Sequence, residues 1–406
     1  MKIVLGLLIL ILTASTGTGG VEKDVVITQW QCRGANIKHN NYIDANIDID
    51  MDSLEVLWER EFPEIRKCWI NNIVSDGERL FVNYYNIIEC IDIDTGEEIW
   101  SNSYGMWESD FQSPILSVFN SSLYYAGHNN SRLFSINCET GDINWIRDAD
   151  EDGVFAYTAP VVSEGRVVCN SGFSVTCIDE ETGGIKWISE EASPSVYSTP
   201  VILGNRVFVA NWVEIYTVSL TSGKLLNTQQ TGGKGELLSQ PRVYGDDIIV
   251  STRCGYKQYN GETGDFVKEY ILDEKCEYGP AEDDRFATND KYKVLLNIDG
   301  YTCLDQNDEK MWTCSGKTPR QSGPIIIGDY IYIPEVERSG EKNSFNITKI
   351  NMEIGNIIDK KTVVTVENDP QSEDLWRQHR YFSYCIFVSG KFFILADYTI
   401  FCVGMP

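Results

Sequence analysis

The chain has 406 residues, of which 42% are hydrophobic, 23% are charged and 33 are glycines. This is the composition of a folded globular protein rather than of a disordered or fibrous one. Its 60 acidic and 34 basic residues give a formal net charge of −26. Such a surface repels nucleic acids and anionic lipids, and no run of Lys or Arg offers a local exception, so we expect neither as a partner.

The first 20 residues have the pattern of a secretory signal peptide. Lys2 precedes an apolar run over Ile3–Leu12, and small residues follow the run. The run is shorter than the roughly 20 apolar residues of a membrane span, and no later segment reaches that length. We therefore expect a secreted, periplasmic or cell-surface protein. Since the first cysteine is Cys32, we expect no lipid anchor at the cleavage site.

A sequence repeat covers most of the remaining chain. Its clearest part is a Thr-Gly pair after acidic residues, with a Trp four residues after the Gly, as at Gly96 and Trp100. The copies of this turn are centred on Gly96, Gly141, Gly183, Gly223 and Gly264, with degenerate copies at Asp305–Asp308 and Met352–Gly355. Their spacing averages about 43 residues, which is within the range of β-propeller blades.

A second phrase keeps the same spacing and predicts strands. A proline opens each copy, at Pro114, Pro160, Pro200, Pro241, Pro280 and Pro324. Alternating apolar residues follow, broken by Gly, Asp and Asn turns, which is typical of hairpins. Four short strands per repeat, without an amphipathic helix, predict a propeller blade. We expect the turn Gly to adopt positive φ and the Trp to wedge between neighbouring blades.

The two ends of the repeat region complete one another. The last copy, over residues 381–402, has three strands and lacks its fourth, whereas Leu54–Glu59 carries the Trp of a fourth strand without the preceding three. Joining them removes both open edges. The sequence thus predicts an all-β fold: an eight-bladed β-propeller of four-stranded antiparallel blades over residues 54–406, with an N-terminal strand closing the last blade. Residues 21–53 are predicted to be a polar linker or cap.

The Asp-x-x-Thr-Gly-x-x-x-Trp phrase and the Pro-started inner strand resemble the PQQ-like propeller repeat over roughly residues 54–402. That family includes quinoprotein alcohol dehydrogenases and the BamB-type propeller of the outer-membrane assembly machine. The first resemblance implies a quinone and Ca²⁺ in the central funnel, an Asp base and a disulfide between adjacent cysteines. This chain has no Cys-Cys pair and no C-x-x-C-H haem motif, so we expect no quinone. The second implies a non-catalytic envelope scaffold, although the lipoprotein Cys of that family is missing.

Twelve cysteines lie beyond residue 20. An even number in an exported protein is compatible with disulfides, and buried strand cysteines acting as small hydrophobic residues are the alternative. No C-x-x-C spacing occurs, so the sequence encodes no local zinc or thioredoxin-type site. Both alternatives stay open.

One acidic segment resembles a Ca²⁺ loop. Asp148, Asp150 and Asp152 alternate and precede Gly153, but Ala159 stands where such loops place a closing Glu. We favour a solvated acidic loop there; no cofactor is expected, and Ca²⁺ is the candidate if one binds. Asp48, Asp50 and Asp52 alternate similarly, and we favour a solvated linker. The three histidines lack a metal partner at i+4, and no nucleophile elbow or phosphate loop is present.

A partner is expected on one face of the ring. In a propeller, the connections between blades and the turns between second and third strands share one face, here called the long-loop face. The Thr-Gly turns occupy the opposite Thr-Gly face. The long insertions, residues 103–111, 148–157, 334–345 and 366–379, all fall on the long-loop face, where binding is expected.

Three tryptophans on the long-loop face, Trp107, Trp212 and Trp376, are candidate partner-binding anchors; packing against their own loops is the alternative. Asn120, Asn129 and Asn346 match the N-glycosylation pattern. The sequence predicts an exported, non-catalytic scaffold that binds a protein, or a glycan, through this face. The alternative is a funnel-based enzyme, quinone-dependent or carbohydrate-active, which would need a convergent cluster of carboxylates, Asn and Arg.

Overall fold

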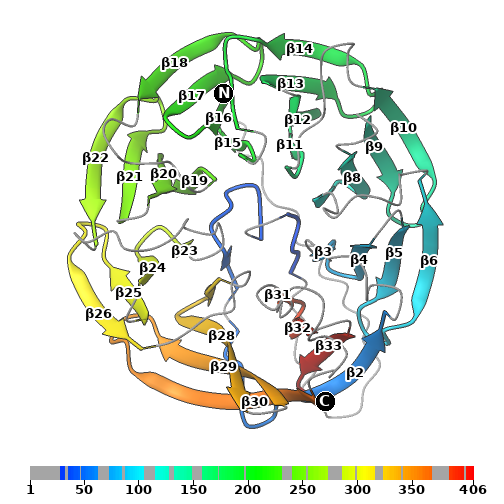
Figure 1. Cartoon of the computed structure of the whole chain (residues 1–406), viewed down its shortest axis with the longest axis vertical. Helices are drawn as coiled ribbons and strands as arrows, with labels where there is room; N and C mark the ends of the chain where they lie inside the picture. The colour runs from blue at the N-terminus through cyan, green and yellow to red at the C-terminus, as the bar shows by residue number, and fades with distance from the viewer. Residues whose placement is uncertain are drawn as a thin grey trace, which may run out of the picture.

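The structure, a computed structural model, describes residues 28–32, 35–45, 47–62, 73–84, 87–104, 115–127, 132–148, 158–171, 173–195, 198–230, 240–252, 255–272, 286–297, 300–315, 323–339, 342–367, 384–396 and 399–406. Within these ranges every regular element is a strand, and the strands form eight separate sheets around a central axis (Figure 1). No helix in these ranges is long and apolar enough to cross a membrane.

The sheets are the predicted blades, labelled A to H in chain order. Blade A contains β3 (Ile73–Ser75), β4 (Arg79–Tyr84), β5 (Ile87–Asp92) and β6 (Glu98–Ser103). Blade B contains β7 (Leu116–Phe119), β8 (Ser122–Gly127), β9 (Arg132–Asn137) and β10 (Ile143–Asp148). Blade C contains β11 (Val161–Ser163), β12 (Arg166–Ser171), β13 (Ser174–Asp179) and β14 (Ile185–Ser189). Blade D contains β15 (Val201–Leu203), β16 (Arg206–Ala210), β17 (Glu214–Ser219) and β18 (Leu225–Gln230).

The second half of the ring repeats this order. Blade E contains β19 (Arg242–Tyr244), β20 (Asp247–Ser251), β21 (Gly255–Asn260) and β22 (Phe266–Ile271). Blade F contains β23 (Phe286–Thr288), β24 (Lys293–Asn297), β25 (Gly300–Leu304) and β26 (Lys310–Cys314). Blade G contains β27 (Ile325–Ile327), β28 (Tyr330–Ser339), β29 (Lys342–Asn351) and β30 (Ile357–Glu367), with β1 (Tyr42–Ile43) added parallel to β27. Blade H contains β31 (Tyr384–Val388), β32 (Lys391–Ala396) and β33 (Thr399–Gly404), and β2 (Glu55–Glu61) is its fourth strand.

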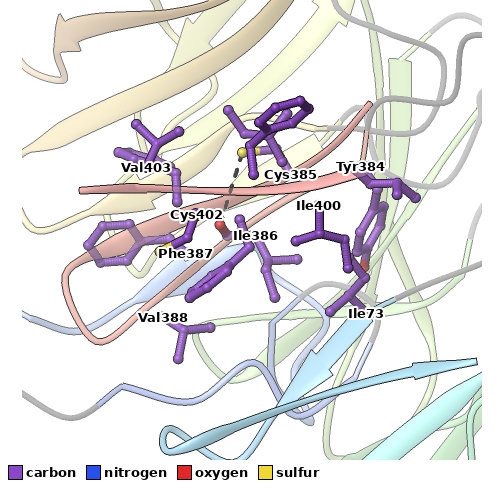
Figure 2. Packing of buried hydrophobic residues seen from close by; sticks show 14 of the residues in the cluster. Ile73, Tyr384, Cys385, Ile386, Phe387, Val388, Ile400, Cys402 and Val403 are labelled. Atoms are coloured by element: carbon purple, nitrogen blue, oxygen red, sulfur yellow. Dashed lines mark hydrogen bonds between the residues drawn. The ribbon is translucent and has the colours of Figure 1, made fainter. Parts of the chain in front are cut away.

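The predicted closure by an N-terminal strand is confirmed. β2 pairs antiparallel with β33, with Trp58 opposite Cys402, so the first and last blade-forming strands share one sheet. In Figure 1 the blue β2 and the red β33 lie side by side at the C-terminus. Behind this seam, side chains of β31 and β33 pack with Ile73 of blade A in one apolar cluster (Figure 2).

One part of the predicted loop pattern is wrong. Residues 334–345 were expected to form a loop on the long-loop face, but all of those described are strand. They extend β28 and β29, whose pairing runs without a break from Tyr330–Asn351 to Ser339–Lys342. Pro334 sits within β28, opposite Ile347, and does not end the strand.

The repeated Trp and Gly form one contact between neighbouring blades. Trp187 on β14 donates its indole N–H to the carbonyl oxygen of Leu220 in blade D at 2.9 Å. Gly223 of the same turn has φ +71°, and a β-carbon there would lie 2.6 Å from the Trp187 ring. The same indole bond joins Trp58 to Ile93, Trp100 to Cys138, Trp145 to Glu180 and Trp312 to Met352. The predicted wedge is therefore present, and it requires a residue without a side chain on the facing turn.

Polar side chains replace the wedge where the repeat degenerates. At the blade D–E contact, Asn227 donates its amide N–H to the carbonyl oxygen of Thr263 at 2.9 Å. At the blade E–F contact, Asp308 holds the turn position at φ +66° and pairs with Lys268 at 2.6 Å and with buried Lys293 at 2.5 Å. Burial opposes ionisation of Asp308, but the hydrogen bonds from these lysines lower the pKa of the carboxyl.

The chain before β2 lies in the centre of the ring (Figure 1). We call the described part of residues 28–54 the strap. Its main chain forms hydrogen bonds with the inner strands in blade order: Trp30 with β3, Gln31 with β7, Lys38 with β19, Asn40 with β23 and Asn41 with β27. Thr28 accepts a hydrogen bond, 2.7 Å long, from the Ser389 N–H in the β31–β32 turn. Turns between first and second strands lie on the Thr-Gly face, so the strap fills that end of the channel. Residues 21–53 were predicted to be a polar linker or cap, and the described part of them packs against the inner strands with Trp30, Ile43, Ile49 and Met51 buried.

All nine described cysteines are buried and unpaired: Cys32, Cys90, Cys138, Cys169, Cys177, Cys303, Cys314, Cys385 and Cys402. Cys68, Cys254 and Cys276 lie outside the described residues. Burial raises the pKa of the Cys138 and Cys385 thiols to about 12. These thiols are therefore protonated at neutral pH, as expected of small hydrophobic residues rather than reactive groups.

The Trp–Gly contact is tested by two glycines in blade C that share a backbone conformation. Gly183 and Gly165 both have φ +71°, but a β-carbon would meet the Trp145 ring at 2.8 Å only at Gly183, and nothing within 4 Å at Gly165. Gly165→Ala should lower the free energy of unfolding by about 1 kcal/mol through backbone strain alone. Gly183→Ala should lower it by about 1–3 kcal/mol more through the clash. Urea denaturation of both variants measures the difference; equal losses would contradict the contact.

The state of the cysteines is tested by alkylation without reductant. Because a thiol must ionise to react, the nine described thiols should resist iodoacetamide at pH 8 in the folded protein and react fully in urea. Mass spectrometry counts the adducts in both states. Fewer than nine adducts in urea would show that some of these cysteines are oxidised.

Candidate functional site

Two neighbouring turns on the long-loop face carry exposed apolar side chains. Phe173, between β12 and β13 of blade C, is 77% exposed, and Trp212, between β16 and β17 of blade D, is 61% exposed. Val213 beside Trp212 is also exposed. We call these three residues the apolar tip. Large exposed aromatic side chains on adjacent hairpins are candidates for a protein interface.

The turn that carries Trp212 is held by its own hydrogen bonds. The side-chain oxygen of Asn211 accepts the N–H groups of Val213 and Glu214 at 2.9 and 2.8 Å. Its amide group donates to the carbonyl oxygen of Ser193 at 3.0 Å and to the Tyr216 hydroxyl at 2.9 Å. Asn favours such turns because its side chain satisfies main-chain donors locally. The fixed turn directs Trp212 outward rather than onto the blade.

Acidic groups flank the apolar tip. Glu190 and Glu191 are exposed where β14 leaves blade C on the same face, and Glu214 begins β17. The Tyr216 hydroxyl donates a hydrogen bond to Glu214. Burial and this hydrogen bond raise the pKa of Tyr216 to about 12, so the hydroxyl keeps its proton at physiological pH. The tip therefore presents an apolar centre with a negative surround.

Of the three predicted anchors, the structure describes only Trp212, which lies on the long-loop face as the sequence suggested. Trp107 and Trp376 lie outside the described residues. Phe173 and Val213 were missed. Phe173 follows Gly172 in a short turn between two apolar strands, and this was the only signal available.

The predicted Ca²⁺ segment is described only at its first residue. Asp148 ends β10, and its carboxylate accepts the Arg132 Nε–H at 2.7 Å. Asp150 and Asp152 lie outside the described residues. In the part of the chain that the structure describes, no group of three or more His, Cys, Asp or Glu side chains is placed to hold a metal ion.

The other alternating acidic segment is exposed, as predicted for a solvated linker, but two of its acids have fixed partners. Asp48 pairs with Lys349 of β29 at 2.5 Å, and Asp50 accepts a hydrogen bond from the Ser53 hydroxyl at 2.6 Å. The two acids are thus tied down by a lysine of blade G and by the strap itself.

The glycosylation candidates differ in exposure. Asn120 is exposed at φ +48° and donates its side-chain N–H to Glu180 at 2.7 Å. Asn346 lies within β29, is 2% exposed, and accepts a hydrogen bond from the Thr362 hydroxyl at 2.6 Å. Its burial argues against modification at that position. Asn129 lies outside the described residues.

Comparison with known proteins finds a family model and a relative that carry the same name. Residues 85–269 match the family model described as outer membrane protein assembly factor BamB. A protein of Moranella endobia (strain PCIT) with that same name is 24% identical over an alignment of 201 residues, and the match covers 45% of this chain. The alignment spans half the length of that relative, 50%.

Solved structures share the fold at low identity. BamB from Moraxella catarrhalis superposes with a TM-score of 0.58 at 13% identity, covering 86% of this chain and 97% of that one. Quinohemoprotein alcohol dehydrogenase from Comamonas testosteroni superposes with a TM-score of 0.67 at 12% identity, covering 93% of this chain and 80% of that one. At these identities the likeness concerns the fold alone. The repeat, the family match over residues 85–269 and the eight closed blades together support a PQQ-like β-propeller similar to the BamB type.

Proposed function

We propose that this protein is an exported, non-catalytic scaffold of the cell envelope that binds a protein partner through its long-loop face. The name of the matched family, an outer membrane protein assembly factor, supports the compartment and the role. The observation that carries the choice of face is the apolar tip, with Phe173 and Trp212 largely exposed on adjacent hairpins. The role needs no cofactor, although Ca²⁺ at Asp148 and the acids after it stays a candidate.

The geometry of the tip favours a protein over a small ligand. A binding pocket surrounds its ligand, whereas this tip projects and would enter a depression on another surface. The hydrogen bonds of Asn211 hold the Trp212 turn before any partner arrives, which lowers the entropy lost on association. The surrounding glutamates favour a partner whose apolar groove is rimmed by Lys or Arg. A glycan is the alternative partner at this face.

The likeness to a quinohemoprotein dehydrogenase is one of fold, at 12% identity, and carries no argument for redox chemistry. Among the described residues we therefore find no feature that favours the enzyme alternative over the scaffold. We retain it only as an outcome that the following experiment can report.

The role of the tip is tested on complexes isolated from the native cells. Native mass spectrometry of the wild-type complex names the bound species as protein, glycan or quinone. With a protein identified, Trp212→Ala should weaken its affinity at least about tenfold, because a central exposed Trp is a frequent hot spot. The control is Ile354→Ala, which truncates a side chain of similar exposure in the β29–β30 turn on the Thr-Gly face. Equal affinities for wild type and the Trp212 variant would exclude this face.

A further inference from the structure

The inner strands present one repeated hydrogen-bond donor to the channel. Ser75, Val118, Val243 and Ile326 occupy equivalent positions, because each pairs with the residue five places later across its own hairpin. Each donates its main-chain N–H to a strap carbonyl: to Trp30 at 2.8 Å, Gln31 at 2.7 Å, Lys38 at 3.0 Å and Asn41 at 2.9 Å. Thr288 of β23 holds the same position and donates its main-chain N–H to Asn40 at 2.9 Å. Five blades thus recognise the strap by its backbone, as an added strand is recognised at a sheet edge.

Beyond Ile43 the strap leaves the channel across blade G with an alternating pattern. Ile43, Ala45, Ile49 and Met51 are buried, whereas Asp44, Asp48 and Asp50 between them are exposed. Successive side chains of an extended segment point to opposite sides, so one side of the strap is apolar and the other acidic. The apolar side joins the cluster that contains β31 and β33.

Lysines of blade G complement the acidic side. The Lys349 ammonium contacts Asp48 at 2.5 Å and the Ile49 carbonyl oxygen at 2.7 Å, and it lies 4.4 Å from the centre of the Tyr330 ring. Its side chain is 7% exposed, so the charge is held in place by these partners. Lys361 donates to the carbonyl oxygen of Asp52 at 2.6 Å. The charge contact with an acidic side chain of the strap is therefore that of Lys349 with Asp48, whereas Lys361 holds the main chain.

We propose that the Thr-Gly end of the channel, continued over blade G, is a binding site for an extended segment of another polypeptide in which apolar residues alternate with acidic ones. The strap is the segment that occupies the site in cis. This inference is independent of the proposed function, because the apolar tip lies on the opposite face. The main-chain N–H donors of the inner strands supply affinity, and the apolar cluster that receives Ile43, Ala45, Ile49 and Met51 sets the register. Lys349 selects an acidic residue in the bound segment.

Covalent attachment explains why the site is filled by the chain itself. A tethered segment acts at an effective concentration in the millimolar range, so a separate segment competes poorly while the tether is intact. Cutting the tether removes this advantage and leaves every contact in place. The binding competence of the site is therefore measurable on the complete chain after one cleavage.

The experiment uses the full chain with a specific protease sequence inserted between Ser53 and Leu54, so that β2 (Glu55–Glu61) stays with the propeller after cleavage. A synthetic peptide of residues 28–53 carrying heavy isotopes is then added in excess, and native mass spectrometry follows the complex. We expect the heavy peptide to replace the original fragment on a propeller that stays folded by circular dichroism. If the heavy peptide does not enter, either because the fragment never leaves or because it leaves and is not replaced, the proposal is wrong.

Matched substitutions test the chemistry of recognition. Lys349→Met should speed release of the fragment about tenfold, because a charge-assisted contact is lost. Lys342→Met is the control, since Lys342 lies in the same strand and its ion-pair partner is Glu367, at 3.9 Å, outside the strap. A peptide with Asp48, Asp50 and Asp52 changed to Lys should compete about tenfold more weakly than the natural one. Equal competition by the two peptides, or equal release from the two variants, would overturn the assigned selectivity.

Discussion

The ring depends on one seam, the pairing of β2 with β33. These strands lie at opposite ends of the chain, yet their register is continuous from Glu55–Gly404 to Glu61–Thr399 apart from one bulge. β2 also connects to the next blade, because Trp58 donates to Ile93 at 3.1 Å and Arg60 donates to the Gly96 carbonyl at 3.1 Å. One strand therefore completes blade H and binds it to blade A. Without it, both blades would expose edges that invite non-native pairing.

The strap extends this closure inward. Its hydrogen bonds reach β3, β7, β19, β23 and β27, so a single stretch of chain links blades that otherwise contact only their neighbours. The Thr-Gly end of the channel is filled as a result, and the two faces differ in character. One face is crossed by an acidic, lysine-bound segment, and the other presents the apolar tip of Phe173 and Trp212. If both proposals hold, a scaffold with two unlike faces would hold two partners at once.

Local, repeated interactions could be predicted from the sequence, and interactions distant along the chain could not. The Thr-Gly turn and its Trp are side-chain signals, so the blade count and the closing strand followed from their spacing. The strap leaves almost no such signal, because its channel contacts are mainly main-chain bonds to residues distant in the sequence, such as that between Asn41 and Ile326. The extension of β28 was missed because Pro334 ordinarily ends a strand. The buried position of Asn346 was missed because a sequon does not show which side of a strand its Asn occupies.

The candidate partner face was predicted, and Trp212 lies on it, but Phe173 had no pattern to mark it.

The central claim is that the N-terminal segment completes the propeller from inside as well as at its edge. Native-state hydrogen exchange at the amides of Val118, Val243 and Ile326 tests it most directly, because each of these N–H groups donates to a carbonyl oxygen of the strap. The account predicts that they exchange as slowly as ladder amides within the same blades. Exchange at the rate of exposed turns, with the ladder amides still protected, would show that the strap does not occupy the channel.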